Sequence, residues 1–168
     1  MRFAYCPYCG GKVTFREIGD EGQMPFCEAC DRPLFDVMHT AIITLPVNEQ
    51  GEAALLRQNY VTKDSYVCVA GYLKTGETAE TAVLREVQEE TGLTPERATY
   101  ISSYYYEKND LLMLGFLTHV SKREFVLSGE VDSAAWFPLE EALAQVREGS
   151  IAWQLIQACR AKLLEEKD

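Results

Sequence analysis

The sequence predicts a mixed α/β domain preceded by a small N-terminal module that a metal ion holds together. Apolar segments typical of strands and of helices are interleaved along residues 38–168, whereas residues 1–37 contain few aliphatic side chains. Four of the six cysteines fall in two Cys-x-x-Cys pairs within this first part. A chain of 168 residues suffices for one ordinary domain and a small addition. We therefore expect two domains, residues 1–37 and residues 38–168.

The N-terminal module contains the pairs 6-CPYC-9 and 27-CEAC-30. Below about 40 residues a chain rarely buries enough surface to fold without help. Four thiolates can close a tetrahedral zinc shell, and metal binding then supplies folding free energy. Two disulfides or a redox Cys-x-x-Cys are the alternatives, but in a chain without a secretory signal such pairs indicate a metal first. We predict a zinc ribbon with a structural Zn²⁺ and the ligands Cys6, Cys9, Cys27 and Cys30.

Five later segments are apolar and rich in β-branched or aromatic residues, which is typical of strands. They are 38-MHTAIITLPV-47, 53-AALLRQN-59, 66-YVCVAGYL-73, 98-ATYISSYYYE-107 and 111-LLMLGFLTHV-120. The last two form a predicted pair that turns at residues 108–110.

Three segments have the apolar spacing or the end signals of helices. They are residues 78–91, 138-PLEEALAQVR-147 and 150-SIAWQLIQACRAKLLEE-166. Thr78 is the expected N-cap of the first helix, and Gly92 stands where a left-handed residue should end it. Strands before and around one central helix, with further helices at the end, predict a mixed α/β sandwich.

The net charge of −10 makes the chain a poor non-specific binder of nucleic acid, because phosphate contacts require Lys and Arg. Its longest apolar runs are far below the ~18–20 residues that span a membrane. The beginning, MRFAYCPYCG, lacks the apolar region of a secretory signal. We expect a cytoplasmic protein without membrane contact.

The segment 71-GYLKTGETAETAVLREVQEETGL-93 crowds Glu86, Glu89 and Glu90 into five positions. On a helix they fall within an arc of about 100°, where their charges repel one another. Mg²⁺ prefers oxygen ligands and is typically held by one or two carboxylates and substrate phosphates. A solvated acidic face is the alternative. Val83, Leu84 and Val87 point to another side, and we expect them to pack on a sheet.

The spacing of this segment is specific. It matches the Nudix box, GX5EX7REUXEEXGU, at every fixed position from Gly71 to Leu93, so the chain resembles Nudix hydrolases. The resemblance implies an α/β/α sandwich with a mixed sheet, a catalytic Mg²⁺ or Mn²⁺, and hydrolysis of a nucleoside diphosphate linked to another group. By position, Glu86 and Glu90 correspond to the main metal ligands, and Glu89 to a further ligand or a base-assisting carboxylate. Arg85 corresponds to the arginine that orients these carboxylates.

Other positions also have counterparts in the family. Glu77 matches the glutamate that ties the loop to the helix, and the backbone carbonyl of Ala70 matches a common metal contact. A zinc ribbon before a Nudix domain resembles the NADH pyrophosphatase subfamily. This subfamily splits NAD(H) into nicotinamide mononucleotide and AMP, and some members remove NAD caps from RNA. That likeness adds Glu130 as a metal ligand, Ala152 as a substrate contact, and a homodimer.

The chain departs from the subfamily at one place. The signature SQPWPFPxS is replaced by 103-SYYYEKNDL-111. Tyr104 and Tyr106 could stack on a base there, with Tyr105 on the opposite face of the strand, or the three could pack on the core. ADP-ribose or another nucleoside diphosphate derivative is therefore an alternative substrate. A nucleic-acid-binding or regulatory protein with a Nudix fold is an alternative of another class.

Overall fold

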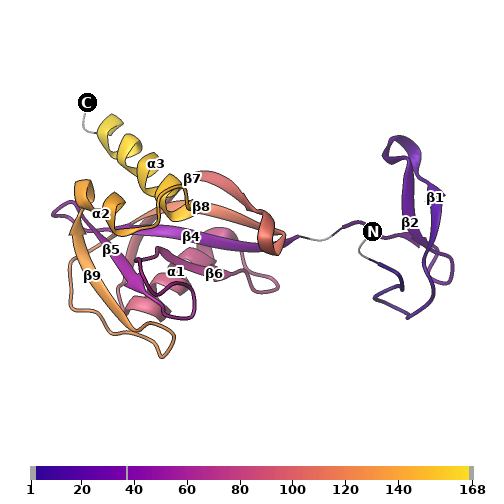
Figure 1. Ribbon diagram of the computed structural model, residues 1–168, viewed down its shortest axis with the longest axis horizontal. Coiled ribbons are helices and arrows are strands. Elements are labelled where there is room, and N and C mark those ends of the chain that lie inside the picture. The colour runs from indigo at the N-terminus through magenta and orange to yellow at the C-terminus, as the bar shows by residue number, and fades with distance from the viewer. Residues whose placement is uncertain (1–2, 37, 167–168) are drawn as a thin grey trace. The chain divides into compact units, whose positions relative to one another are not determined.

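The computed structural model describes residues 3–36 and 38–166, and the chain forms two compact units, Met1–Met38 and His39–Asp168 (Figure 1). We predicted a boundary between residues 37 and 38; residue 37 lies outside the described residues. Among the described residues, no helix is both long and apolar enough to cross a membrane.

The N-terminal unit is a small antiparallel sheet with the strand order β1-β2-β3. Its elements are β1 (Thr14–Glu17), η1 (Gly19–Glu21), β2 (Gln23–Cys27) and β3 (Arg32–Pro33). Its buried core consists of Cys6, Cys27 and Leu34, with Phe3, Val13 and Cys30 packed against them. Half of this core is cysteine, so apolar burial alone gives the unit little stability.

In the described part of the larger unit, six strands form one mixed sheet. They are β4 (His39–Val47), β5 (Glu52–Arg57), β6 (Val69–Tyr72), β7 (Pro95–Tyr106), β8 (Leu111–Val120) and β9 (Ser133–Pro138). The strand order is β7-β8-β4-β5-β9, and β6 also pairs with β4. Strands β4 and β8 run parallel, whereas the other pairs are antiparallel.

Helices cover both faces of this sheet (Figure 1). They are α1 (Ala79–Thr91), α2 (Leu139–Gln145) and α3 (Ile151–Glu165). Alternate residues of β4 point to opposite faces, so Ile42 packs with Val83 of α1, whereas Ile43 and Leu45 pack with Leu155 of α3. Burial on both faces explains the nearly continuous apolar sequence of β4. The predicted α/β/α sandwich with a mixed sheet is confirmed.

Two details differ from the sequence-based expectation. We did not predict strand β9, which pairs with β5 along its whole length; its composition, SAAWFP, has no run of β-branched residues. Pro138 is its last residue as well as the N-cap of α2. We also expected Leu84 to pack on the sheet, but its side chain is exposed, whereas Val83 and Val87 are fully buried.

Candidate functional site

Helix α1 is capped at both ends as predicted. The Thr78 hydroxyl accepts a hydrogen bond from the backbone N–H of Thr81 at 3.3 Å. Gly92 adopts the left-handed conformation with φ 71°, and its N–H donates to the carbonyl of Gln88 at 2.9 Å. A side chain at Gly92 would also collide with Val126. These caps fix where the helix begins and ends, and therefore the direction in which its carboxylates point.

Arg85 is the hub of the acidic face. Its Nε and Nη2 donate to the two carboxylate oxygens of Glu77 at 2.7 and 2.9 Å. Its Nη1 donates to Glu86 at 2.5 Å and to Glu89 at 3.0 Å, and Nη2 also reaches the carbonyl of Tyr72 at 3.2 Å. A guanidinium offers this fork of donors, and a lysine does not. The repulsion expected among the glutamates is thus partly offset by one half-buried cation.

Glu77 joins the preceding loop to the helix. Besides the Arg85 pair, its carboxylate accepts a hydrogen bond from the backbone N–H of Lys74 at 3.0 Å. Hydrogen bonding from Arg85, followed by that from Lys74, lowers the pKa of Glu77 to about 2. Glu77 therefore stays ionised at any physiological pH, and it holds Arg85 in place.

Gly71 makes room for Glu86. A Cβ added at Gly71 would overlap the carboxylate of Glu86, so only glycine allows that carboxylate to lie against the backbone of β6. The Glu86 side chain is 12% exposed. Strand β6 and helix α1 thereby form a cradle for one carboxylate.

Glu90 is the buried member of the cluster, with 4% of its surface exposed. Gln58, itself buried, donates from Nε2 to Glu90 Oε1 at 2.9 Å, whereas Oε2 has no hydrogen-bond partner. Burial raises the pKa of Glu90 to about 7, and the charges of Glu86 and Glu130 contribute to the rise. A buried carboxylate beside other carboxylates, with one oxygen unpaired, fits a divalent cation that prefers oxygen ligands. We did not predict Gln58. The only signal in the sequence is its position as a polar residue directly after the apolar run 53-AALLR-57.

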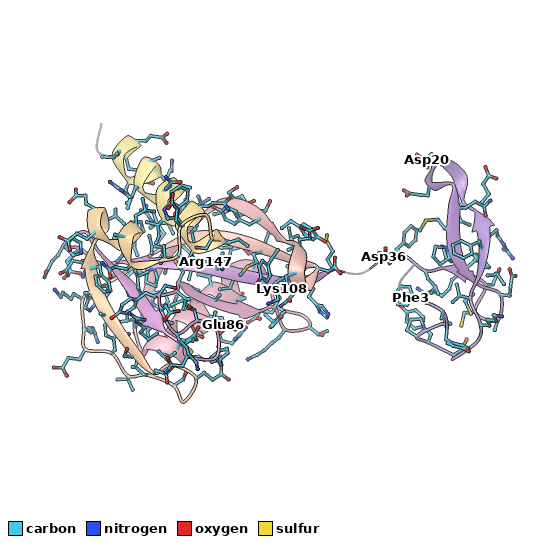
Figure 2. All side chains as sticks on the ribbon, in the orientation of Figure 1. Phe3, Asp20, Asp36, Glu86, Lys108 and Arg147 are labelled. Carbon is cyan, nitrogen blue, oxygen red and sulfur yellow. The ribbon has the colours of Figure 1, made fainter. Side chains whose placement is uncertain are left out.

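Side chains of α1, among them Glu86, Glu89 and Glu90, line one hollow of about 510 Å³, near the place where Figure 2 labels Glu86. We call it the first hollow. Its walls combine carboxylates, two basic side chains, two tyrosines and an apolar patch. They are Glu86, Glu89, Glu90 and Glu130; Arg85 and Lys74; Tyr60 and Tyr72; and Ala41, Ala70, Gly71, Leu73, Leu111 and Met113. The arrangement can hold a cation, a phosphate group and a flat ring together.

The comparisons with known proteins agree with this geometry. A family model described as the NUDIX domain matches residues 37–159. The chain belongs to the Nudix family.

Curated relatives of this Nudix chain include the NAD-capped RNA hydrolase NudC of Stutzerimonas stutzeri, which is 31% identical over 161 residues, 95% of this chain and 57% of the relative. The NAD-capped RNA hydrolase NUDT12 of Homo sapiens is 29% identical over 158 residues, 88% of this chain and 34% of the relative. The chain thus spans between about a third and just over half of these relatives. The crystal structure of a NUDIX hydrolase from Nitrosomonas europaea aligns with a TM-score of 0.68 and 19% identity, covering 98% of this chain and 92% of the other. This likeness shows the shared fold.

The structure brings most of the predicted Nudix residues together. Arg85, the three box glutamates, Ala70 and Glu130 all line the first hollow, although Glu130 comes from a loop far along the chain. Tyr104, Tyr106 and Ala152 are not among the described residues that line it. Tyr104 and Ala152 pack in the core cluster that contains Leu155, on the α3 side. Substrate contacts by these three residues therefore stay predictions, and this hollow does not provide them within one chain.

The cysteines of the N-terminal unit meet as predicted. The Sγ atoms of Cys6, Cys9, Cys27 and Cys30 all lie within 4.8 Å of one another, and none of these cysteines forms a disulfide. Backbone N–H groups of Tyr8 and Gly11 each donate to one sulfur at 3.4 Å. Such a set of four sulfurs could hold a metal ion such as zinc. Cys68 and Cys159 are buried in the core of the larger unit, and we assign them no chemical role.

Proposed function

We propose that this Nudix chain hydrolyses the diphosphate bond of a nucleoside diphosphate derivative, and that NAD(H) is its substrate, giving nicotinamide mononucleotide and AMP. The observation that carries the proposal is the carboxylate of Glu90. It is buried, its Oε2 has no hydrogen-bond partner, and it lines the same hollow as Glu86, Glu89 and Glu130. A cation with a preference for oxygen would stabilise these clustered carboxylates.

Glu86 and Glu90 would hold Mg²⁺ or Mn²⁺, with the carbonyl of Ala70, Glu89 and Glu130 as further ligands. When bound, the metal neutralises the diphosphate and polarises the attacking water. Among these ligands, Glu89 is the candidate to accept a proton from that water, because its side chain is the most open of the three box glutamates, at 52% exposed. Arg85 is a positioning residue that orients Glu86 and Glu89.

The choice of NAD(H) is supported by the two curated relatives, both of which are named NAD-capped RNA hydrolases. In this chain, Tyr72 and the apolar patch of Leu111 and Met113 offer a flat wall for a base beside the carboxylates. Lys74, 64% exposed at 3.7 Å from Glu89, is available to a phosphate group. An NAD-capped RNA contains the same diphosphate bond in its cap and would be a macromolecular substrate of the same reaction.

ADP-ribose is the second candidate, because the NADH-type signature is replaced at residues 103–111 and its tyrosines do not line the first hollow. A purely nucleic-acid-binding role is disfavoured by the hydrogen-bonded set of Arg85, Glu77 and Glu86, which a binding protein would not need. We also propose that the four clustered cysteines bind a structural Zn²⁺. The homodimer and the cytoplasmic location stay predictions.

A substrate panel with Mg²⁺ or Mn²⁺ tests the proposal: NADH, NAD⁺, ADP-ribose, diadenosine polyphosphates and nucleoside triphosphates, with products resolved by chromatography. We expect AMP and reduced nicotinamide mononucleotide from NADH. Glu86→Gln should abolish turnover, whereas Glu80→Gln, on the exposed side of the same helix, should retain it. Faster turnover of ADP-ribose would select the second candidate. No turnover of any diphosphate would overturn the enzymatic proposal.

A further inference from the structure

A second hollow of about 500 Å³ adjoins the first. It is lined by Asn59, Tyr60, Gly129, Glu130 and Asp132. Tyr60 and Glu130 also line the first hollow, so the two hollows meet at these two side chains. A volume of this size is within the usual range of small-molecule sites. A ligand that reaches from the carboxylates of the first hollow past Tyr60 therefore enters the second.

The walls of the second hollow are tied to each other. The backbone N–H of Asn59 donates to Asp132 Oδ2 at 2.7 Å, and the N–H of Asp132 donates to the carbonyl of Arg57 at 2.9 Å. The turn that carries Tyr60 is closed by hydrogen bonds from Val61 and Thr62 to the carbonyl of Gln58, at 2.8 and 3.0 Å. Tyr60 is nevertheless 70% exposed. The hydrogen-bonded turn thus holds the exposed ring of Tyr60 beside the carboxylates of Glu130 and Asp132.

The chemistry of this lining selects against phosphate. Of the described residues that line the second hollow, none is basic, and Glu130 and Asp132 are acidic. Carboxylates accept hydrogen bonds from hydroxyl and amino groups, and they repel a phosphate. The face of an aromatic ring stacks on a nucleobase. The first hollow, in contrast, contains Lys74 and Arg85. A phosphate is therefore expected in the first hollow and an uncharged nucleoside in the second.

We propose that the second hollow binds the adenosine of the substrate, with the base stacked on Tyr60 and the ribose hydroxyls or the 6-amino group facing Asp132 and Asn59. The inference rests on the proposed function, and it holds for either of its candidates, because NAD(H) and ADP-ribose share adenosine diphosphate. One consequence is specificity: a 2′-phosphate on this ribose, as in NADPH, meets the carboxylate of Asp132 without a basic partner in the described lining.

The test compares wild type with Tyr60→Ala, Tyr60→Phe and Asp132→Asn on NADH, NADPH and ADP-ribose. Loss of one base-stacking contact should raise KM by about tenfold for Tyr60→Ala, with a smaller change in kcat. Tyr60→Phe keeps the ring and should behave as wild type. Asp132→Asn keeps an acceptor for the N–H of Asn59 but removes the negative charge. The KM values of this variant for NADH and NADPH should therefore differ less than those of the wild type. Tyr105→Ala, which removes a comparably exposed tyrosine outside both hollows, is the matched control.

Binding of adenosine alone, followed by ligand-observed NMR, separates this inference from the proposed function. Adenosine should bind wild type and Tyr60→Phe, and bind Tyr60→Ala detectably more weakly, whether or not any diphosphate is hydrolysed. Equal adenosine binding by wild type and Tyr60→Ala would overturn the inference. Wild-type KM values for NADPH and NADH that agree within twofold, or a Tyr60→Ala effect confined to kcat, would overturn it as well. Absence of turnover with intact adenosine binding would reject the proposed function alone.

Discussion

Arg85 holds Glu77 through two parallel hydrogen bonds of 2.7 and 2.9 Å, and the same guanidinium reaches Glu86 and Glu89. The side chains of Arg85 and Glu77 are only 17% and 10% exposed, so solvent weakens this pair less than a surface ion pair. The carboxylates proposed to bind metal are thus positioned by a residue that need not touch the substrate.

Arg85→Lys keeps the positive charge but loses the planar set of N–H donors that the guanidinium offers. We expect kcat to fall about 100-fold, because Glu86 and Glu89 lose their common donor, and the free energy of unfolding to fall by about 2 kcal/mol. Steady-state kinetics and urea unfolding measure the two effects, and Arg147→Lys, at an exposed position, is the control. In a double-mutant cycle with Glu77→Gln the losses should not add. Additive losses would show that the two residues act separately.

Gly71→Ala should lower activity much more than stability. The new Cβ would overlap the carboxylate of Glu86, and this flexible end can move aside at a cost of about 1 kcal/mol, the lower end of the usual cost of overpacking. Its displacement should lower kcat by about 100-fold. Gly115→Ala is the contrast, because its Cβ would lie 2.7 Å from Tyr104 and 3.1 Å from the carbonyl of Ser102.

That second substitution crowds the core on the α3 side, away from the first hollow. We expect it to lower the free energy of unfolding by about 1–3 kcal/mol and to lower kcat much less than Gly71→Ala does. Thermal unfolding and kinetics on both variants provide the check. Similar profiles for the two would contradict the role given to Gly71.

Glu90 predicts a pH dependence of stability in EDTA-treated protein. Its pKa is about 7 in the folded chain, against about 4.3 for an ordinary glutamate. The folded state therefore holds this proton more tightly. The corresponding stability is fully present below about pH 4.3 and is lost as the pH rises through 7.

Glu90→Gln cannot ionise, so its free energy of unfolding should not fall in this way as the pH rises. The new amide oxygen still accepts a hydrogen bond from Gln58. At pH 8 the EDTA-treated variant should be more stable than wild type by about 3 kcal/mol, and at pH 5 the difference should shrink. Mg²⁺ should then stabilise wild type more than the variant, because the variant has lost one of the proposed carboxylate ligands. Urea unfolding with and without Mg²⁺ measures both differences. Glu80→Gln controls for the loss of one charge, and an unstable Glu90→Gln protein at pH 8 would refute the explanation.

The cysteine cluster predicts one zinc ion per chain. Elemental analysis of the native protein should find it, and Cys27→Ser should abolish it and unfold the N-terminal unit, since binding supplies the folding free energy there. Cys159→Ala changes a buried cysteine of the other unit and should leave the zinc content unchanged. Native protein without zinc would rule out the ribbon as a zinc site.

Those parts of the site that depend on local spacing could be predicted from the sequence. Helical periodicity placed Glu86, Glu89 and Glu90 on one face, and two pairs of cysteines specified a four-sulfur cluster. These inferences needed only the geometry of a helix and the ligand number of a metal, which do not depend on the rest of the fold. The caps at Thr78 and Gly92 are local for the same reason.

Which distant residues join them depends on how the whole sheet folds. The pairing of β5 with β9 aligns two remote segments, and Asn59 and Tyr60 after β5 thereby lie beside Glu130 and Asp132 before β9. The same sheet packs Tyr104 against the core cluster that contains Leu155, and base stacking by this residue stays a prediction. Strand register is a property of the whole sheet, and a short strand such as β9 has too weak a local pattern to reveal it.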